Sequence, residues 1–196
     1  MKYIIISLCS LFIFVSSCKS QQEVNQEAAE LDNLNNKVLN EWNRLTTLND
    51  NRNNMSLELL KLFESGAGSN AFDSKELIEL TERAKEIDKT EDVIVDEDKF
   101  LSYSKLQADI SEQISRMLVT ADNKKIHNSS FDGLLAQLEN VQNHIAISEH
   151  DYNSAVQAYN MKGLANKTFL GLHSNFVKKC YFKAKAGGET PPKVDF

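Results

Sequence analysis

Residues 131–160 read FDGLLAQLENVQNHIAISEHDYNSAVQAYN and carry the clearest periodicity in the chain. Their apolar side chains recur at steps of three and four, with one skip at Ser148. That spacing places an apolar face along one side of an α-helix. The stretch therefore predicts a long amphipathic helix, and we expect Gly163 to close it. The residues of this face are Leu134, Leu138, Val141, Ile145, Tyr152, Val156 and Tyr159.

Three further helices are predicted ahead of this one. The first runs from about residue 30 to residue 64, although poor helix formers at 49–54 (NDNRNN) interrupt its apolar stripe. The second begins where Asp73 or Ser74 can cap it, and the third begins near residue 98. The apolar positions that define the three are Leu31, Val38, Leu45 and Leu59, then Leu77, Leu80, Ala84 and Ile87, then Leu106, Ile110 and Met117.

The composition favours helices throughout. Both prolines lie at 191 and 192, so helix interiors before them carry none. Strand-like alternation does not extend beyond residues 93–95. We therefore expect an all-α antiparallel bundle of about four helices of unequal length. The long first and last helices should project past the shorter middle pair, and the aromatic tail 169–196 should pack back irregularly.

The N-terminus has the pattern of a targeting segment. Lys2 is followed by an apolar run over residues 3–15, which is shorter than the roughly 20 residues that a spanning helix needs. Residues 15–18 (VSSC) resemble the lipobox of bacterial lipoproteins, so Cys18 is the predicted lipidation site. Ordinary secretion with an incidental Cys18 and an uncleaved anchor helix are the alternatives. The predicted organisation is a signal peptide over 1–17, a polar tether over 18–29 that can join the first helix, and a helical domain over 30–196.

Cysteine usage and charge narrow the possible partners. Cys9 would leave with the signal peptide and Cys18 would carry lipid, so Cys180 has no partner for an internal disulfide. We interpret Cys180 as a half-buried small apolar residue. The net charge of −6 argues against nucleic acid and against flat binding to anionic headgroups.

No catalytic or metal constellation is predicted, and no cofactor is expected. His144 and His150 are six residues apart and so lie on different sides of a helix, and His127 and His173 are isolated. The acidic run at 96–98 (DED) lacks the pattern of a dedicated calcium loop. Phosphate-binding, metalloprotease and nucleophile motifs are absent from the sequence, so we expect a protein that is not an enzyme.

The fourth helix contains a repeated pair, Tyr152-Asn153-x-x-Val156-x-x-Tyr159-Asn160, which resembles a motif of the LemA family. The tyrosines should line the core seam, and the asparagines could cross-link helices or face water. Other pieces that resemble the family are FDGLLAQL at 131–138, LGL at 170–172, YFKA at 181–184 and PKVDF at 192–196. The chain departs from the family pattern at three places: Glu149 or His150 replaces an arginine, Lys162-Gly163 replaces Phe-Pro, and 50–54 shortens a longer segment.

The resemblance implies a long-helix bundle outside the cytoplasm, and the lipobox implies that Cys18 tethers it to a membrane of the bacterial envelope. We therefore expect a scaffold or adaptor lipoprotein that presents a helix face to an envelope protein. The alternative is a periplasmic ligand-binding or sensing module, with an enzyme the least favoured. A deep apolar cavity beside Tyr152, Tyr159 and Phe182 would favour the alternative, whereas a filled seam would favour the scaffold.

Overall fold

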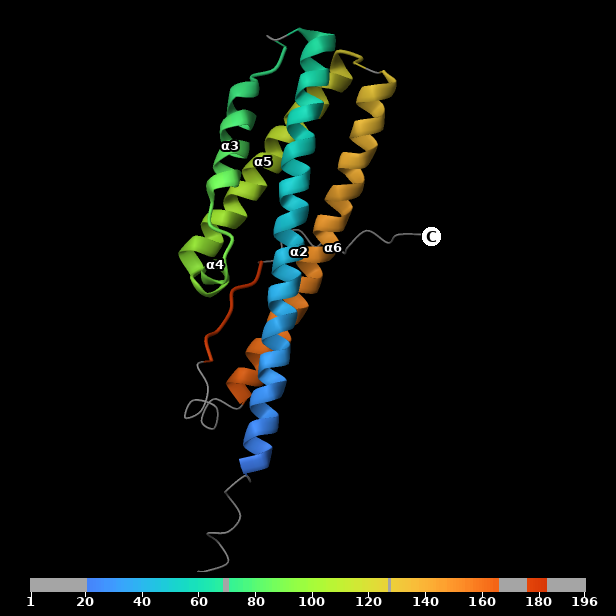
Figure 1. Ribbon diagram of the computed structural model, residues 1–196. Helices are drawn as coiled ribbons and strands as arrows, with labels where there is room; N and C mark the ends of the chain where they lie inside the picture. The colour runs from blue at the N-terminus through green and yellow to red at the C-terminus, as the bar shows by residue number, and fades with distance from the viewer. Residues whose placement is uncertain (1–20, 69–70, 127, 166–175, 183–196) are drawn as a thin grey trace, which may run out of the picture.

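A computed structural model describes residues 21–68, 71–126, 128–165 and 176–182 (Figure 1). Within these ranges the regular secondary structure is entirely helical, which confirms the predicted all-α class. The helices are α2 (Gln21–Ala67), α3 (Ser74–Glu86), α4 (Glu91–Val95), α5 (Glu97–Asn123) and α6 (Ser129–Ala165). The predicted signal peptide at 1–17 and the predicted lipidation site Cys18 lie outside the described residues.

The long helix α2 is the spine of the molecule. Its 47 residues span about 70 Å at 1.5 Å per residue. It begins at Gln21, so most of the predicted tether at 18–29 is helical, and Val24 and Leu31 are already buried. The run at 49–54 does not end the helix, and its side chains Asn49 and Arg52 find buried partners on α5.

The other helices pack around α2. Figure 1 shows α6 lying antiparallel along the spine and α3 and α4 on the other side, while α5 starts beside α4 and runs obliquely across the spine until its last turns lie near the start of α6. The α3–α5 group covers only the part of the spine that is farther from Gln21, so α2 and α6 project together past it. This confirms the expectation that the first and last helices extend beyond the middle pair.

Side-chain caps set three of the helix starts. Asp73 accepts a hydrogen bond from the backbone of Lys75 at the start of α3, as predicted. Asp96 accepts from the backbones of Asp98 and Lys99 at the start of α5, so the acidic run at 96–98 belongs to a helix terminus and not to a loop. Asn128 does the same for α6. Caps of this kind each contribute about 1 kcal/mol.

Two apolar clusters form the core. The first surrounds Trp42 and brings together α2, α4, α5 and α6, and its members include Phe100, Tyr103 and Tyr152. The second is farther along α2 and includes Leu59, Phe63, Leu77, Ile110 and Met117. On α2 the clusters are separated by one short polar stretch from Asn49 to Ser56, whose residues facing the interior are buried.

Two local predictions need correction or completion. Gly163 does not close the last helix, because α6 continues to Ala165. Of the aromatic tail at 169–196, the structure describes residues 176–182, which form an extended segment beside α4 (red in Figure 1). The rest of the tail lies outside the described residues.

Candidate functional site

The repeated Tyr-Asn pair lies on the inner face of α6. Tyr152, Val156 and Tyr159 are buried, and they form the seam that the sequence predicted. Asn160 is also buried and Asn153 is half-buried. The two asparagines are two helical turns apart and therefore point to the same side of α6.

Each asparagine pairs with the backbone of the extended segment 176–182. The Asn160 side chain donates to the Lys179 carbonyl (2.8 Å) and accepts from the Lys179 N–H (2.9 Å). Asn153 pairs in the same way with Phe182, at 3.0 Å and 2.9 Å. Each carboxamide thus replaces the N–H and C=O that a neighbouring strand would supply. We call Asn153 and Asn160 the asparagine clamp.

The spacing of the clamp matches the spacing of an extended chain. Seven residues of α-helix advance about 10.5 Å, and three residues of an extended chain advance about 10 Å. Asn153 and Asn160 are seven residues apart, and their partners Phe182 and Lys179 are three apart in the opposite direction. A heptad repeat of asparagine therefore reads every third residue of an antiparallel extended segment.

A third contact lies between the two asparagines. The Tyr152 hydroxyl donates to the Cys180 carbonyl at 2.8 Å, and the Cys180 N–H donates to the Ile94 carbonyl of α4 at 2.7 Å. Burial raises the pKa of Tyr152, so its hydroxyl stays a donor at neutral pH. The segment is therefore held from α6 on one side and from α4 on the other.

Aromatic contacts seat both ends of the segment. The Phe182 ring lies 4.8 Å from the Phe100 ring and 5.7 Å from the Tyr152 ring, between centroids. At the other end Phe176 packs 5.4 Å from Tyr159. A Cβ placed on Gly163 would stand 2.1 Å from the Phe176 ring, so Gly163 makes room for that ring.

Lys179 is the buried charge of the segment. Its side chain is only 2% exposed, and its ammonium lies 3.0 Å from Glu91 of α4. The same ammonium lies 5.2 Å from the centroid of the Tyr159 ring, a cation–π distance. Phe176, Lys179 and Phe182 thus anchor the segment at three-residue intervals.

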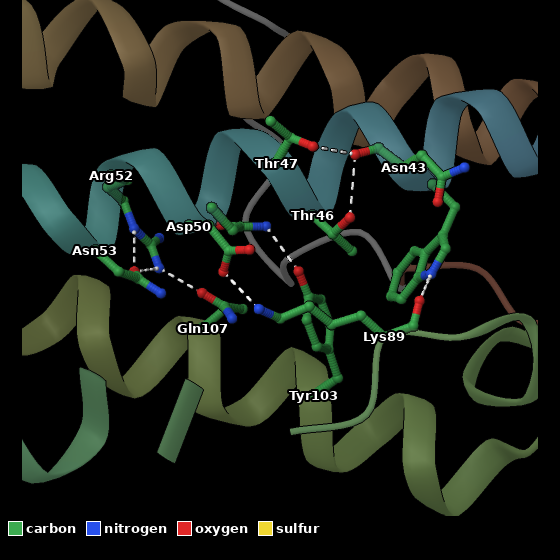
Figure 2. Close-up of polar contacts among 11 residues, drawn as sticks. Asn43, Thr46, Thr47, Asp50, Arg52, Asn53, Lys89, Tyr103 and Gln107 are labelled. Atoms are coloured by element: carbon green, nitrogen blue, oxygen red, sulfur yellow. Dashed lines mark hydrogen bonds and ion pairs between the residues drawn. The ribbon is translucent and has the colours of Figure 1, made fainter. Parts of the chain in front are cut away.

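A second feature is a buried polar layer between α2 and α5, which Figure 2 shows in close-up. We define it as Asn49, Arg52 and Asn53 of α2 with Tyr103 and Gln107 of α5. Arg52 donates to the Gln107 side-chain oxygen at 2.6 Å and to the Asn53 side-chain oxygen at 2.9 Å. The Asn49 side chain donates to the Tyr103 hydroxyl at 3.1 Å. These bonds connect the two helices at one level.

Arg52 carries the electrostatic cost of this layer. Its exposed fraction is 2%, and burial lowers its pKa to about 10. The negative charge of Glu149 on α6 raises the pKa of Arg52 and so partly offsets the effect of burial. Arg52 also donates to the Ser111 hydroxyl at 2.7 Å. The guanidinium remains protonated at neutral pH and needs these acceptors to stay buried.

The link between α3 and α4 is attached to the spine next to the polar layer (Figure 2). The Trp42 indole donates to the Lys89 carbonyl at 2.8 Å. The Lys89 ammonium in turn lies 2.6 Å from Asp50. This link therefore has one backbone and one ionic contact with α2.

The histidines and cysteines that the sequence offers as candidate site residues lie partly inside and partly outside the described ranges. His144 and His150 are exposed, whereas His127 and His173 lie outside the described residues, as does Cys18. Burial raises the pKa of the half-buried Cys180 thiol, so the thiol is protonated at neutral pH. In the ranges that the structure describes, no three His, Cys, Asp or Glu side chains gather as a metal ion would require.

The Tyr-Asn pair was predictable from the sequence, but the segment that it binds was not. The run at 49–54 was predicted to interrupt the apolar stripe, yet the sequence also indicates a continuous helix there. Leu45, Asn49, Arg52, Ser56 and Leu59 follow one another at steps of four and three, so the helical register continues through the polar run. A charged residue at such a core position indicates a buried polar network.

Comparison with known proteins identifies one matching family. The sequence profile of the LemA family matches residues 41–196, which is most of the chain and includes both the clamp and the polar layer. No curated protein matches the chain. Among the described helices, none combines the length and the apolar character needed to cross a bilayer.

Proposed function

The chain belongs to the LemA family, and we propose that it is a lipid-anchored scaffold or adaptor on the extracytoplasmic side of a bacterial envelope membrane. In this proposal Cys18 carries the lipid, the helical bundle presents a rigid surface to an envelope protein, and the chain catalyses no reaction. The observation that carries the proposal is the projecting pair of long helices, α2 and α6, which are packed together by buried apolar side chains.

The start of α2 supports the attachment. Gln21 is three residues beyond Cys18, so a lipid there would join a helix of about 70 Å almost directly. Two or more acyl chains hold a protein stably on a bilayer without a spanning helix. A rigid rod attached at one end would place its far end at a fixed distance from the membrane, which suits a scaffold.

Ion pairs join α6 to the N-terminal part of α2. The Lys162 ammonium of α6 lies 2.6 Å from both Glu27 and Glu30 of α2. Nearby on the last turns of α6, Met161 and Leu164 are three residues apart and exposed by 63% and 51%. Side chains at this spacing share a helix face. They form a small apolar surface on the projecting part of the molecule and are our candidate partner contact.

The ligand-binding alternative loses support from the packing of the seam. Tyr152 is fully buried, with Trp42, Phe100 and Phe182 around it at centroid distances of 5.6, 6.2 and 5.7 Å. A hollow of about 180 Å³ lies elsewhere, against Leu118, Leu135 and Gln142 on α5 and α6. That volume is below the roughly 300 Å³ at which small-molecule sites begin.

The hydrogen bonds of the residues with shifted pKa values support the proposal that the chain catalyses no reaction. Tyr103 and Tyr152 have raised pKa values because they are buried, and Arg52 has a lowered pKa for the same reason. Each of the three is engaged in a hydrogen bond to protein. None therefore presents a free acid or base to a substrate.

The test is crosslinking in intact cells followed by purification in a mild detergent. We expect wild-type chain to recover a defined envelope protein, and the variant Met161→Asp with Leu164→Asp to lose it. Lys75→Asp, at an exposed site on α3, is the matched control and should retain the partner. Recovery of the chain alone from wild-type cells would overturn the scaffold proposal.

The anchor is tested separately. The intact mass of the mature protein should show cleavage before Cys18 and addition of lipid, and Cys18→Ser should release the chain from the membrane fraction. A mature N-terminus at any other residue would refute the anchor and leave the partner experiment to be judged on its own.

A further inference from the structure

The asparagine clamp holds its occupant mainly through main-chain atoms. Asn153, Asn160, Tyr152 and the Ile94 carbonyl all bond to backbone N–H or C=O groups of residues 179, 180 and 182. Recognition of this kind is how proteins bind extended peptides: main-chain bonds give affinity, and pockets for particular side chains give specificity.

Three side chains supply the specificity. Phe176 packs against Tyr159 over the bare face of Gly163, Lys179 reaches Glu91, and Phe182 packs against both Phe100 and Tyr152. The intervening side chains of Val177 and Tyr181 are exposed by 50% and 52%. The site therefore selects an extended sequence of the form Phe-x-x-Lys-x-x-Phe and is tolerant of two intervening positions.

We propose that the clamp is a peptide-binding site whose ligand in trans is segment 176–182 of a second copy of this chain. The segment fills all three side-chain positions of the site, so an identical chain brings a ligand that is known to fit. Ten residues separate Ala165 from Phe176, and a chain of that length reaches up to about 35 Å. That reach allows exchange between two copies whose α6 helices lie side by side.

The same connection sets when exchange occurs. A short tether holds the segment at an effective concentration near its own clamp on the order of millimolar. A dilute chain therefore closes on itself, and exchange becomes competitive where chains are crowded or where the internal contact is weakened. This self-association goes beyond the scaffold proposal and depends neither on a lipid at Cys18 nor on an envelope partner.

The test uses two complementary variants of the full chain with different affinity tags, kept reduced so that Cys180 cannot form a disulfide. The donor carries Asn153→Ala and Asn160→Ala, so its clamp is disabled and its segment is intact. The acceptor carries Lys179→Pro. This change removes the N–H that donates a hydrogen bond to the Asn160 side-chain oxygen, and it leaves both asparagines of the clamp in place. Both are purified in detergent with micelles in excess.

We expect each variant alone to be monomeric and the mixture to form a one-to-one heterodimer whose fraction rises with concentration. A synthetic peptide of residues 176–182, with serine in place of Cys180, should dissociate it. A donor with Asn140→Ala, an exposed asparagine of the same helix, keeps its own clamp filled and should not pair.

A mixture that stays monomeric, with both variants retaining wild-type helix content by circular dichroism, would overturn the proposal. So would a peptide that binds the acceptor while the heterodimer fails to form. If Lys179→Pro disturbs the fold, Phe182→Ala replaces it as the acceptor, because it removes an anchor without touching the backbone bonds at Lys179, and its outcomes are judged in the same way.

Discussion

Replacing Gly163 by alanine gives the sharpest test of the clamp, because the structure reverses the usual sign of the change. Glycine inside a helix costs roughly 0.5–1 kcal/mol relative to alanine, so Gly→Ala normally stabilises. At Gly163 the new Cβ would lie 2.1 Å from one ring carbon of Phe176 and 2.3 and 2.6 Å from two others. The ring must therefore move by more than 1 Å or leave its position.

The control is on the same helix. Gly133 is also within five residues of an end of α6, and a Cβ built there meets no atom of the described structure within 4 Å. Both substitutions gain a similar helix-propensity term, so the difference between them isolates the steric one. Overpacking of this kind costs about 1–3 kcal/mol. We expect Gly133→Ala to raise the free energy of unfolding. The free energy of unfolding of Gly163→Ala should be about 1–3 kcal/mol lower than that of Gly133→Ala.

The measurement is urea unfolding followed by far-ultraviolet circular dichroism and by fluorescence of Trp42, the single tryptophan. For a chain of this size the difference corresponds to about 2–4 °C in Tm per kcal/mol. Adding Phe176→Ala should remove the clash and make Gly163→Ala stabilising in that background. If the two glycine variants were equally stabilising, the segment 176–182 would not lie against α6, and the clamp itself would be wrong.

Two further predictions concern the interior. Arg52→Met should lower the free energy of unfolding by about 1–3 kcal/mol, since it strands the side-chain oxygens of Gln107 and Asn53, and Arg52→Met with Gln107→Leu should recover part of that loss; additive losses in urea unfolding would show that Arg52 and Gln107 are not coupled. Tyr103, Tyr152 and Tyr159 have raised pKa values in the folded chain because of burial, so the stability they supply is complete below about pH 10 and is lost as the pH rises further. The lowered pKa of Arg52, about 10, acts in the opposite direction over the same range, because the unfolded chain then holds the extra proton, and it offsets about one tyrosine. The Tm should therefore fall as the pH rises from about 10 to about 11 while the tyrosinate absorbance rises with unfolding, and a flat Tm over that range would contradict the burial of these hydroxyls.

The helices were predictable because their apolar positions repeat. The stripe on α6 and the cap at Asp73 could be read from local sequence, whereas the cap at Asp96 was not predicted. Intrinsic propensity misled at 49–54, where asparagines weaken a helix in isolation. In the folded chain Arg52 donates to Asn53 and to Gln107 of α5, and Asn49 donates to Tyr103 of α5, so tertiary contacts outweigh local preference.

The clamp was only half predictable. The repeat of Tyr152-Asn153 in Tyr159-Asn160 marks two asparagines on one face, which sequence alone can give. Their partners are backbone groups of residues 179–182, and backbone groups carry no sequence signature. The same limit applies to Gly163, whose requirement for a bare Cα depends on a ring thirteen residues away in the chain.

The clamp and the polar layer both prevent slippage, which is the weakness of long regular helices. Heptad-spaced apolar stripes remain nearly matched after a shift of seven residues, and the repeated asparagines would likewise accept the segment three residues out of register. For the segment, Lys179 opposite Glu91 and Phe182 against Phe100 permit one register alone.

For α5 against α2, a shift of one heptad would replace Gln107 opposite Arg52 by Phe100 or Ile114. The buried guanidinium would then lose Gln107 as an acceptor, and removing one partner of a buried charge costs roughly 3–5 kcal/mol. Apolar burial therefore supplies the stability of this bundle, while a few polar side chains at core positions decide which of its nearly equivalent alignments is occupied.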